Sequence, residues 1–100
     1  MEVTVSGKHI EVTEPIREYA EEKANRAARY FNGVTSMDVI LDKTDSHTFD
    51  CELIAHINGH DNFVATGKHA DLYACIDETS SKIERQIHDH KEKIKNHKHG

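Results

Sequence analysis

Residues 48–68 read TFDCELIAHINGHDNFVATGK, and this stretch predicts two β-strands joined by a turn. Apolar and polar residues alternate through residues 48–57, a period of two that is typical of a strand with one buried face. The positions expected to face inward are Phe49, Cys51, Leu53, Ala55 and Ile57. Asn58-Gly59 is a strong turn signal, extended here to Asn62, and residues 63–68 form a second, shorter strand.

The same alternation recurs at residues 1–7 and 36–44, which predicts two further strands. Val3 and Val5 share one face of the first of these strands. In the second, the inward positions are Met37, Val39 and Leu41. The strand positions expected to face outward are polar, apart from Ile40. One face of the sheet should therefore be solvated.

Two segments have the three- and four-residue spacing of amphipathic helices. The first begins at the N-cap candidate Thr13, has Pro15 in its first turn, and extends to about Phe31, where Asn32-Gly33 should end it. The second begins near Ala70. Its apolar stripe consists of Leu72, Tyr73, Ile76, Ile83, Ile87 and Ile94, interrupted by Thr79 and Ser80. These two polar residues predict that the second helix packs less firmly on the sheet.

The order of elements is strand, helix, three strands, helix. The helix between the first two strands favours a parallel, right-handed connection, and the last three strands should form an antiparallel meander. Because the outward positions are polar, both helices should cover the same face. We therefore predict a two-layer α+β domain, β-α-β-β-β-α, with a four-stranded mixed sheet.

Length and composition exclude several classes of protein. A chain of 100 residues favours one domain, and 36% apolar against 31% charged residues indicates a thin core with a large solvated surface. Cys51 and Cys75 form no CxxC pair and follow no secretory leader, which favours buried free thiols in a cytoplasmic protein. No run approaches the roughly 20 apolar residues of a membrane span, so no membrane partner is expected.

Charge is distributed unevenly along the chain. The net charge is −5, yet residues 79–100 hold six lysines and arginines against three acids, a net +3 that leaves −8 for residues 1–78. The candidate RNA-binding residues are Lys23, Arg26 and Arg29 on the first helix and Lys82, Arg85, Gln86, Lys91, Lys93 and Lys95 on the second. If both helices cover one face of the sheet, these residues form a surface that fits a phosphate backbone. Alternatively, the bases pair with acids one helical turn away.

Nine histidines raise the possibility of a metal site. His88 and His90 are two residues apart and diverge by about 200° on a helix, so they do not form a chelating pair. His97 and His99 remain candidates in an extended tail. No cysteine pairs with a histidine at zinc-like spacing, and no catalytic motif occurs. The sequence predicts no metal, no cofactor, no small-molecule substrate and no catalytic residue.

Residues 64–87, VATGKHADLYACIDETSSKIERQI, resemble the short form of the ribosome hibernation promoting factor family, also called ribosome-associated inhibitors or ribosomal subunit interface proteins. The similar positions are Gly67-Lys68-His69, Asp71-Leu72-Tyr73, Ile76-Asp77 and residues 82–87, KIERQI. Residues 3–31 are similar to the opening strand and first helix of that family. The resemblance covers almost the whole chain and implies the same β-α-β-β-β-α fold.

The resemblance implies a non-enzymatic protein that binds rRNA of the small ribosomal subunit in the groove used by mRNA and tRNA, and so inhibits translation in stress or stationary phase. It implies a ribosome-binding domain at residues 1–96, a flexible His/Lys tail at residues 97–100, and a monomer away from the ribosome. Pairing of ribosomes should need a separate partner. Glu84 and Asp89 depart from the basic pattern of the family. A general structured-RNA-binding module and a His-rich metal-binding stress protein remain as alternatives.

Overall fold

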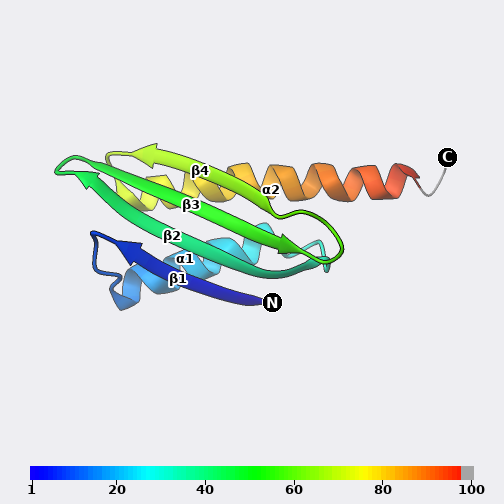
Figure 1. Ribbon diagram of the computed structural model, residues 1–100, viewed down its shortest axis with the longest axis horizontal. Coiled ribbons are helices and arrows are strands. Elements are labelled where there is room, and N and C mark those ends of the chain that lie inside the picture. The colour runs from blue at the N-terminus through cyan, green and yellow to red at the C-terminus, as the bar shows by residue number, and fades with distance from the viewer. Residues whose placement is uncertain (98–100) are drawn as a thin grey trace.

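A computed structural model describes the backbone of residues 1–97 and the side chains of residues 1–94. It contains six elements in the predicted order (Figure 1). Their bounds are β1 Glu2–Lys8, α1 Glu14–Ala27, β2 Val34–Asp45, β3 Thr48–Ile57, β4 Phe63–His69 and α2 Leu72–His97.

The four strands form one mixed sheet in the order β1-β2-β3-β4. β1 is parallel to β2, with Val5 opposite Val39, and the β2–β3 and β3–β4 pairs are antiparallel. Both helices lie behind the sheet in Figure 1, side by side on one face, and the last turns of α2 extend past the end of the sheet. The predicted two-layer α+β fold is confirmed.

The core lies between the sheet and the two helices. The strands contribute the predicted inward residues, including Met37, Leu41 and Leu53, and α2 contributes Ile76 and Ile83, all less than 2% exposed. The buried residues of α1 are Ala20, Ala24 and Ala27, whose small side chains let that helix lie close to its neighbours. Both cysteines are free and buried, as predicted.

The first helix is shorter than predicted, because α1 ends at Ala27 and not near Phe31. Ala28 leaves helical geometry with φ −101° and ψ 1°, and the amide of Phe31 donates to the carbonyl of Ala28 at 3.2 Å. The tighter turn directs the half-buried Phe31 ring against the core. Gly33 has no left-handed φ. A Cβ there would lie 2.5 Å from the Phe31 ring, so this glycine makes room for the ring.

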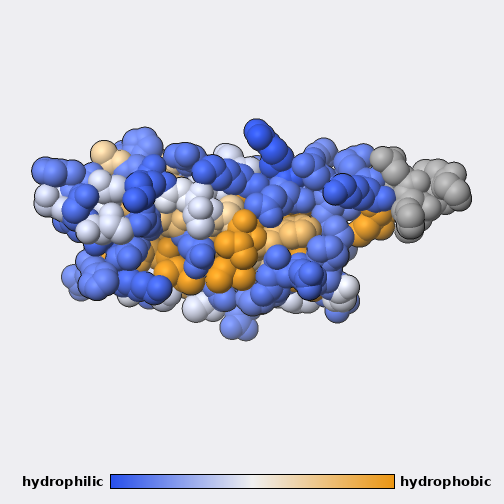
Figure 2. All heavy atoms as spheres, turned by 45° about the horizontal axis from the view of Figure 1, so that its top comes forward, coloured by the Kyte–Doolittle hydropathy of each residue, from blue (hydrophilic) through white to orange (hydrophobic). Residues whose placement is uncertain are grey.

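The outward face of the sheet is less polar than predicted. Ile54 and Val64 face outward together with Ile40, and the register places Ile54 directly opposite Val64. Val64 is 46% exposed, and Figure 2 shows apolar side chains exposed in the middle of the view among hydrophilic neighbours. The alternation hid this patch because Ile54 lies between two inward apolar residues, Leu53 and Ala55, in an almost continuous apolar run.

α2 begins at Leu72, two residues later than expected, because Asp71 caps it. The Asp71 carboxylate accepts a hydrogen bond from the amide of Tyr73 at 3.0 Å. Further along, Thr79 is fully buried against Gly67 of β4, where a Cβ would overlap the threonine hydroxyl. That hydroxyl donates to the carbonyl of Cys75 at 2.7 Å. Thr79 therefore marks a close approach of α2 to β4.

Ser80, the second polar residue on the stripe, is also buried, and its hydroxyl has no hydrogen-bond partner in the described part of the chain. Such an unpaired group lowers stability, so weaker packing of α2 stays a prediction. The predicted tail boundary also stays untested. His97 is the last residue of α2, and residues 98–100 lie outside the described residues. None of the helices in residues 1–97 is both long and apolar enough to span a membrane.

Candidate nucleic-acid interface

The three candidate bases of the α1 region have different surroundings. Lys23 lies with its amine 3.2 Å from a carboxylate oxygen of Asp77 on α2. Arg26 bonds Glu22 at 2.8 Å, an i,i+4 pair of the kind that the alternative interpretation predicted. Arg29, just past the end of α1, has its guanidinium 4.9 Å from the centroid of the exposed Tyr30 ring. Of these three bases, only Arg29 makes no ion pair with a described residue.

Asp77 also joins the two helices through a residue that the sequence did not single out. The Tyr19 hydroxyl donates to Asp77 at 2.5 Å, and the Tyr19 ring meets the ring of Tyr73 edge to face at 4.9 Å. This hydrogen bond, with burial and the carboxylate charge, raises the pKa of Tyr19 to about 12. The cluster holds α1 and α2 side by side. No local pattern predicts it, because the partners are 58 positions apart.

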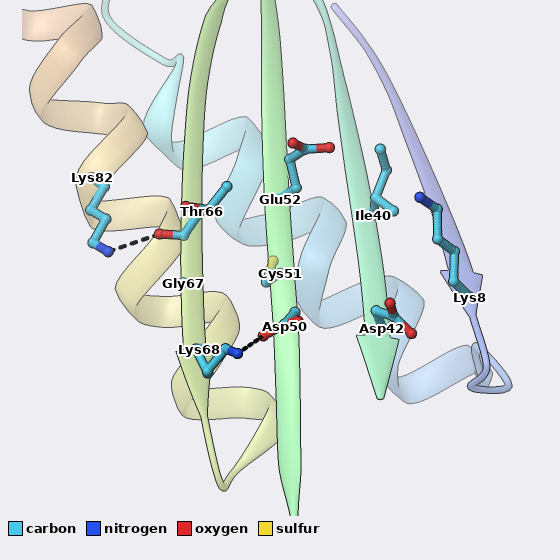
Figure 3. A pocket seen from close by; sticks show the side chains of 10 residues that line it. All are labelled: Lys8, Ile40, Asp42, Asp50, Cys51, Glu52, Thr66, Gly67, Lys68 and Lys82. Carbon is cyan, nitrogen blue, oxygen red and sulfur yellow. Dashed lines mark hydrogen bonds and ion pairs between the residues drawn. The ribbon is translucent and has the colours of Figure 1, made fainter. Parts of the chain in front are cut away.

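Lys82 and Gln86 lie on the flank of α2 that faces the open edge of β4. The Lys82 amine donates to the carbonyl of Thr66 at 2.8 Å, and the Gln86 amide donates to the carbonyl of Val64 at 2.9 Å. β4 has only β3 as a neighbour, so these carbonyls would otherwise lack a partner in the sheet. Figure 3 shows Lys82 reaching the strand from α2. Both residues therefore have a structural role that their sequence pattern did not predict.

The remaining candidates on α2 point in other directions. The Lys91 amine donates to the carbonyl of Tyr30 at 2.7 Å, across the space between the helices. Lys93 lines a hollow together with Gln86 on the β4 flank. Arg85 and Lys93 are exposed and form no hydrogen bond or ion pair within the described side chains of residues 1–94. The side chain of Lys95 lies outside the described residues.

Both sets of bases therefore belong to the helical layer, but they do not form one continuous strip. Glu84, His88 and Glu92 of α2 face α1 and line a groove of about 330 Å³ between the helices. Its other walls carry Tyr30 and Phe31 from the turn after α1. A phosphate backbone crossing the helical layer would meet the bases on either side of this partly acidic groove.

The opposite face of the molecule, the outer face of the sheet, also carries both acids and bases. A shallow hollow of about 500 Å³ lies across the strands (Figure 3). Three carboxylates line it, those of Asp42, Asp50 and Glu52, together with the lysines Lys8, Lys68 and Lys82. The Lys68 amine lies 3.7 Å from Asp50. Since the acids balance the bases, this hollow offers no excess positive charge to a polyanion.

Histidines and cysteines do not form a reactive site in the described residues. His88 is exposed in the groove between the helices, whereas the His90 ring lies 4.5 Å from that of His60, which confirms that the two diverge. No group of three metal-ligating side chains occurs among the residues that the structure describes. Burial raises the pKa of the Cys51 thiol to about 12, so it stays protonated and a poor nucleophile at neutral pH. His97 and His99 lie outside the described side chains.

Residues 3–95 match the family model described as Sigma 54 modulation protein / S30EA ribosomal protein, and the chain belongs to this family. It is 40% identical over 93 residues to a ribosome hibernation promoting factor of Pseudomonas putida, which covers 93% of this chain and 89% of the relative. It is 32% identical to the protein of that name from Escherichia coli strain K12, covering 97% and 100% of the two chains. Its structure resembles the crystal structure of the N-terminal domain of Protein Y from Thermus thermophilus, with a TM-score of 0.78, 30% identity and coverage of 87% and 96%.

Proposed function

We propose that this protein is a ribosome hibernation factor that binds the small ribosomal subunit and inhibits translation in stress or stationary phase. The observation that carries the proposal is membership of a family whose relatives, at 32–40% identity over nearly the whole chain, are named ribosome hibernation promoting factors. The protein acts in the cytoplasm, without an enzymatic step, as a monomer away from the ribosome. It occupies the groove used by mRNA and the anticodon ends of tRNA and excludes both sterically.

The helical layer is the face that meets rRNA. Arg85 and Lys93 are exposed without intramolecular partners in the described residues, so they bind phosphate at no structural cost. Arg29 keeps its charge beside an exposed aromatic ring. Lys82, Gln86 and Lys91 each bond a backbone carbonyl, which orders their side chains before binding. Lys23, Arg26 and Lys95 complete the proposed interface.

The test is pelleting of the protein with small ribosomal subunits across a salt series, with mRNA as competitor. The variant is Arg85→Glu/Lys93→Glu, which reverses two unpaired charges on the helical layer. A matched control is Lys8→Glu/Lys68→Glu, which makes the same charge change on the opposite face. We expect the first variant to lose binding, the control to keep it, and mRNA and rising salt to displace the wild-type protein.

Two results would contradict the proposal. Equal loss of binding in both double variants would show that net charge, and not the helical layer, directs association. Equal affinity of the wild-type protein for a free RNA duplex and for small subunits would favour the alternative of a general structured-RNA-binding module.

A further inference from the structure

Tyr30 is the most exposed large hydrophobic or aromatic side chain of the described residues, at 71%. It lies in the turn that follows α1, on the rim of the groove between the helices. An aromatic ring that is left in solvent beside basic residues is typical of proteins that bind unpaired nucleobases, since every base has a π-face that stacks.

The groove beside Tyr30 has an apolar floor and charged walls. The floor consists of Ala27, Ile87 and the Phe31 ring, and the walls carry Glu84 and Lys91 among others. Its volume of about 330 Å³ is at the small end of the roughly 300–1,000 Å³ range of ligand pockets. These dimensions and this lining fit a single flat ring that is apolar on its faces and polar at its edge.

Two basic groups are placed to hold the phosphates beside such a ring. The Lys91 amine uses one of its three donors on the carbonyl of Tyr30, which leaves two for a phosphate. The Arg29 guanidinium lies 4.9 Å from the centroid of the Tyr30 ring. Because the ring stays 71% exposed with Arg29 beside it, room for stacking remains.

The acids of the groove distinguish it from a plain phosphate site. Glu84 and Glu92 line it from α2, where they repel a phosphate but accept hydrogen bonds. A carboxylate accepts from the exocyclic amino group of cytosine, adenine or guanine, whereas uracil has no such group. This gives Glu84 and Glu92 a role in selecting the base.

We propose that the groove between α1 and α2 binds one unstacked, amino-bearing RNA base, which stacks on Tyr30 and donates to Glu84 or Glu92 while Arg29 and Lys91 hold the flanking phosphates. This inference rests on the proposed function, because it names the part of the RNA that the helical layer takes. The groove would provide a contact that recognises a base, in addition to the phosphate contacts of the helical layer.

The first experiment uses tyrosine fluorescence, because the chain contains no tryptophan and three tyrosines. Short oligocytidylate is titrated into the full chain, and stacking on Tyr30 should quench part of the emission. Tyr30→Phe should keep the affinity and lose that quenching. Tyr30→Ala should weaken binding roughly five- to tenfold or more, the effect of removing one stacked base. Val64→Ala, at an exposed apolar residue of the sheet, is the control and should behave as wild type.

The second experiment compares oligocytidylate with oligouridylate. The wild-type protein should prefer the cytidine oligomer, and Glu84→Ala/Glu92→Ala should remove this preference. The ratio of the two affinities is the readout, since loss of two negative charges raises the affinity for both. Equal binding of both oligomers by the wild-type protein, or no quenching by either at saturation, would overturn the proposal.

A parallel assay of binding to small ribosomal subunits distinguishes failure of this inference from failure of the proposed function. One outcome is that the oligomers cause no quenching, while the wild-type protein and Tyr30→Ala bind subunits equally well. This outcome would overturn the base site and leave the hibernation proposal intact. If oligocytidylate quenches the fluorescence but the protein fails to bind subunits, the base site would stand and the hibernation proposal would be overturned.

Discussion

The amine of Lys82 on α2 lies 2.8 Å from the carbonyl oxygen of Thr66 on the open edge of β4. Gln86, one turn later, bonds the carbonyl of Val64 in the same way. At the other edge of the sheet, the Arg17 guanidinium bonds the carbonyl of Val5 on β1 at 3.3 Å. Both edge strands are thus covered by long polar side chains from the helices, which hinders pairing with another strand. Residues expected to bind RNA also protect the sheet.

Lys82 bonds the edge of the sheet and Arg85 does not. Substitutions of the two residues should therefore differ in their effect on stability but not in their effect on ribosome binding. Lys82→Met should lower the free energy of unfolding by about 1 kcal/mol, the net value of one hydrogen bond, because it frees the Thr66 carbonyl. Arg85→Met should stay within about 0.5 kcal/mol of wild type. Each should reduce the salt dependence of ribosome binding by about one phosphate contact. Denaturant unfolding and subunit pelleting measure the two effects, and an unchanged stability of Lys82→Met would contradict the structural role.

The close approach of Gly67 and Thr79 predicts an energetic coupling between β4 and α2. A Cβ on Gly67 would overlap the Thr79 hydroxyl, so Gly67→Ala should destabilise the protein by about 1–3 kcal/mol. Thr79→Ala removes the overlapping oxygen and should make the Gly67 substitution at least about 1 kcal/mol less costly. Thr79→Ser keeps that oxygen and should give no relief. Equal costs in both backgrounds, measured by denaturant unfolding, would rule out this contact as the cause.

His90 predicts a dependence of stability on pH. Desolvation, His60 and Lys93 lower its pKa from the ordinary 6.5. Since the unfolded chain then binds a proton more readily than the folded one, the free energy of unfolding should fall as pH drops through 6.5 toward the folded pKa. His90→Phe should show a shallower fall between about pH 7.5 and pH 5.5 than wild type. His88→Gln, at an exposed position, is the control and should keep the wild-type slope.

The raised pKa of Tyr19 predicts a loss of stability at alkaline pH. Its pKa of about 12 means that the folded protein holds this proton more tightly than an ordinary tyrosine with a pKa of 10. The free energy of unfolding should therefore decrease between about pH 10 and pH 12. Tyr19→Phe should remove the late phase of tyrosine ionisation seen by ultraviolet absorbance and cost about 1 kcal/mol at neutral pH. Tyr30→Phe, whose hydroxyl has no partner in the described part of the chain, should leave that late phase in place.

The sequence by itself determined the order of elements, the fold class and most of the core. Alternation placed Met37, Val39 and Leu41 inward, and turn residues separated the strands, because both signals act between residues close in the chain. Predictions from local sequence were wrong where a contact between residues of different elements determines the structure. α1 ends at Ala27 because the Phe31 ring turns back to the core, a contact that the helical spacing of residues 16–31 does not reveal.

The tertiary structure alone decided the character of the candidate site. Helical spacing identified the bases, but Lys82, Gln86 and Lys91 proved to bond carbonyls that are 16, 22 and 61 positions away. The groove beside Tyr30 likewise exists only where the turn after α1 meets α2. Periodicity reports the side of an element on which a residue lies. The partner that meets it there depends on how separate elements pack, which is a property of the whole fold.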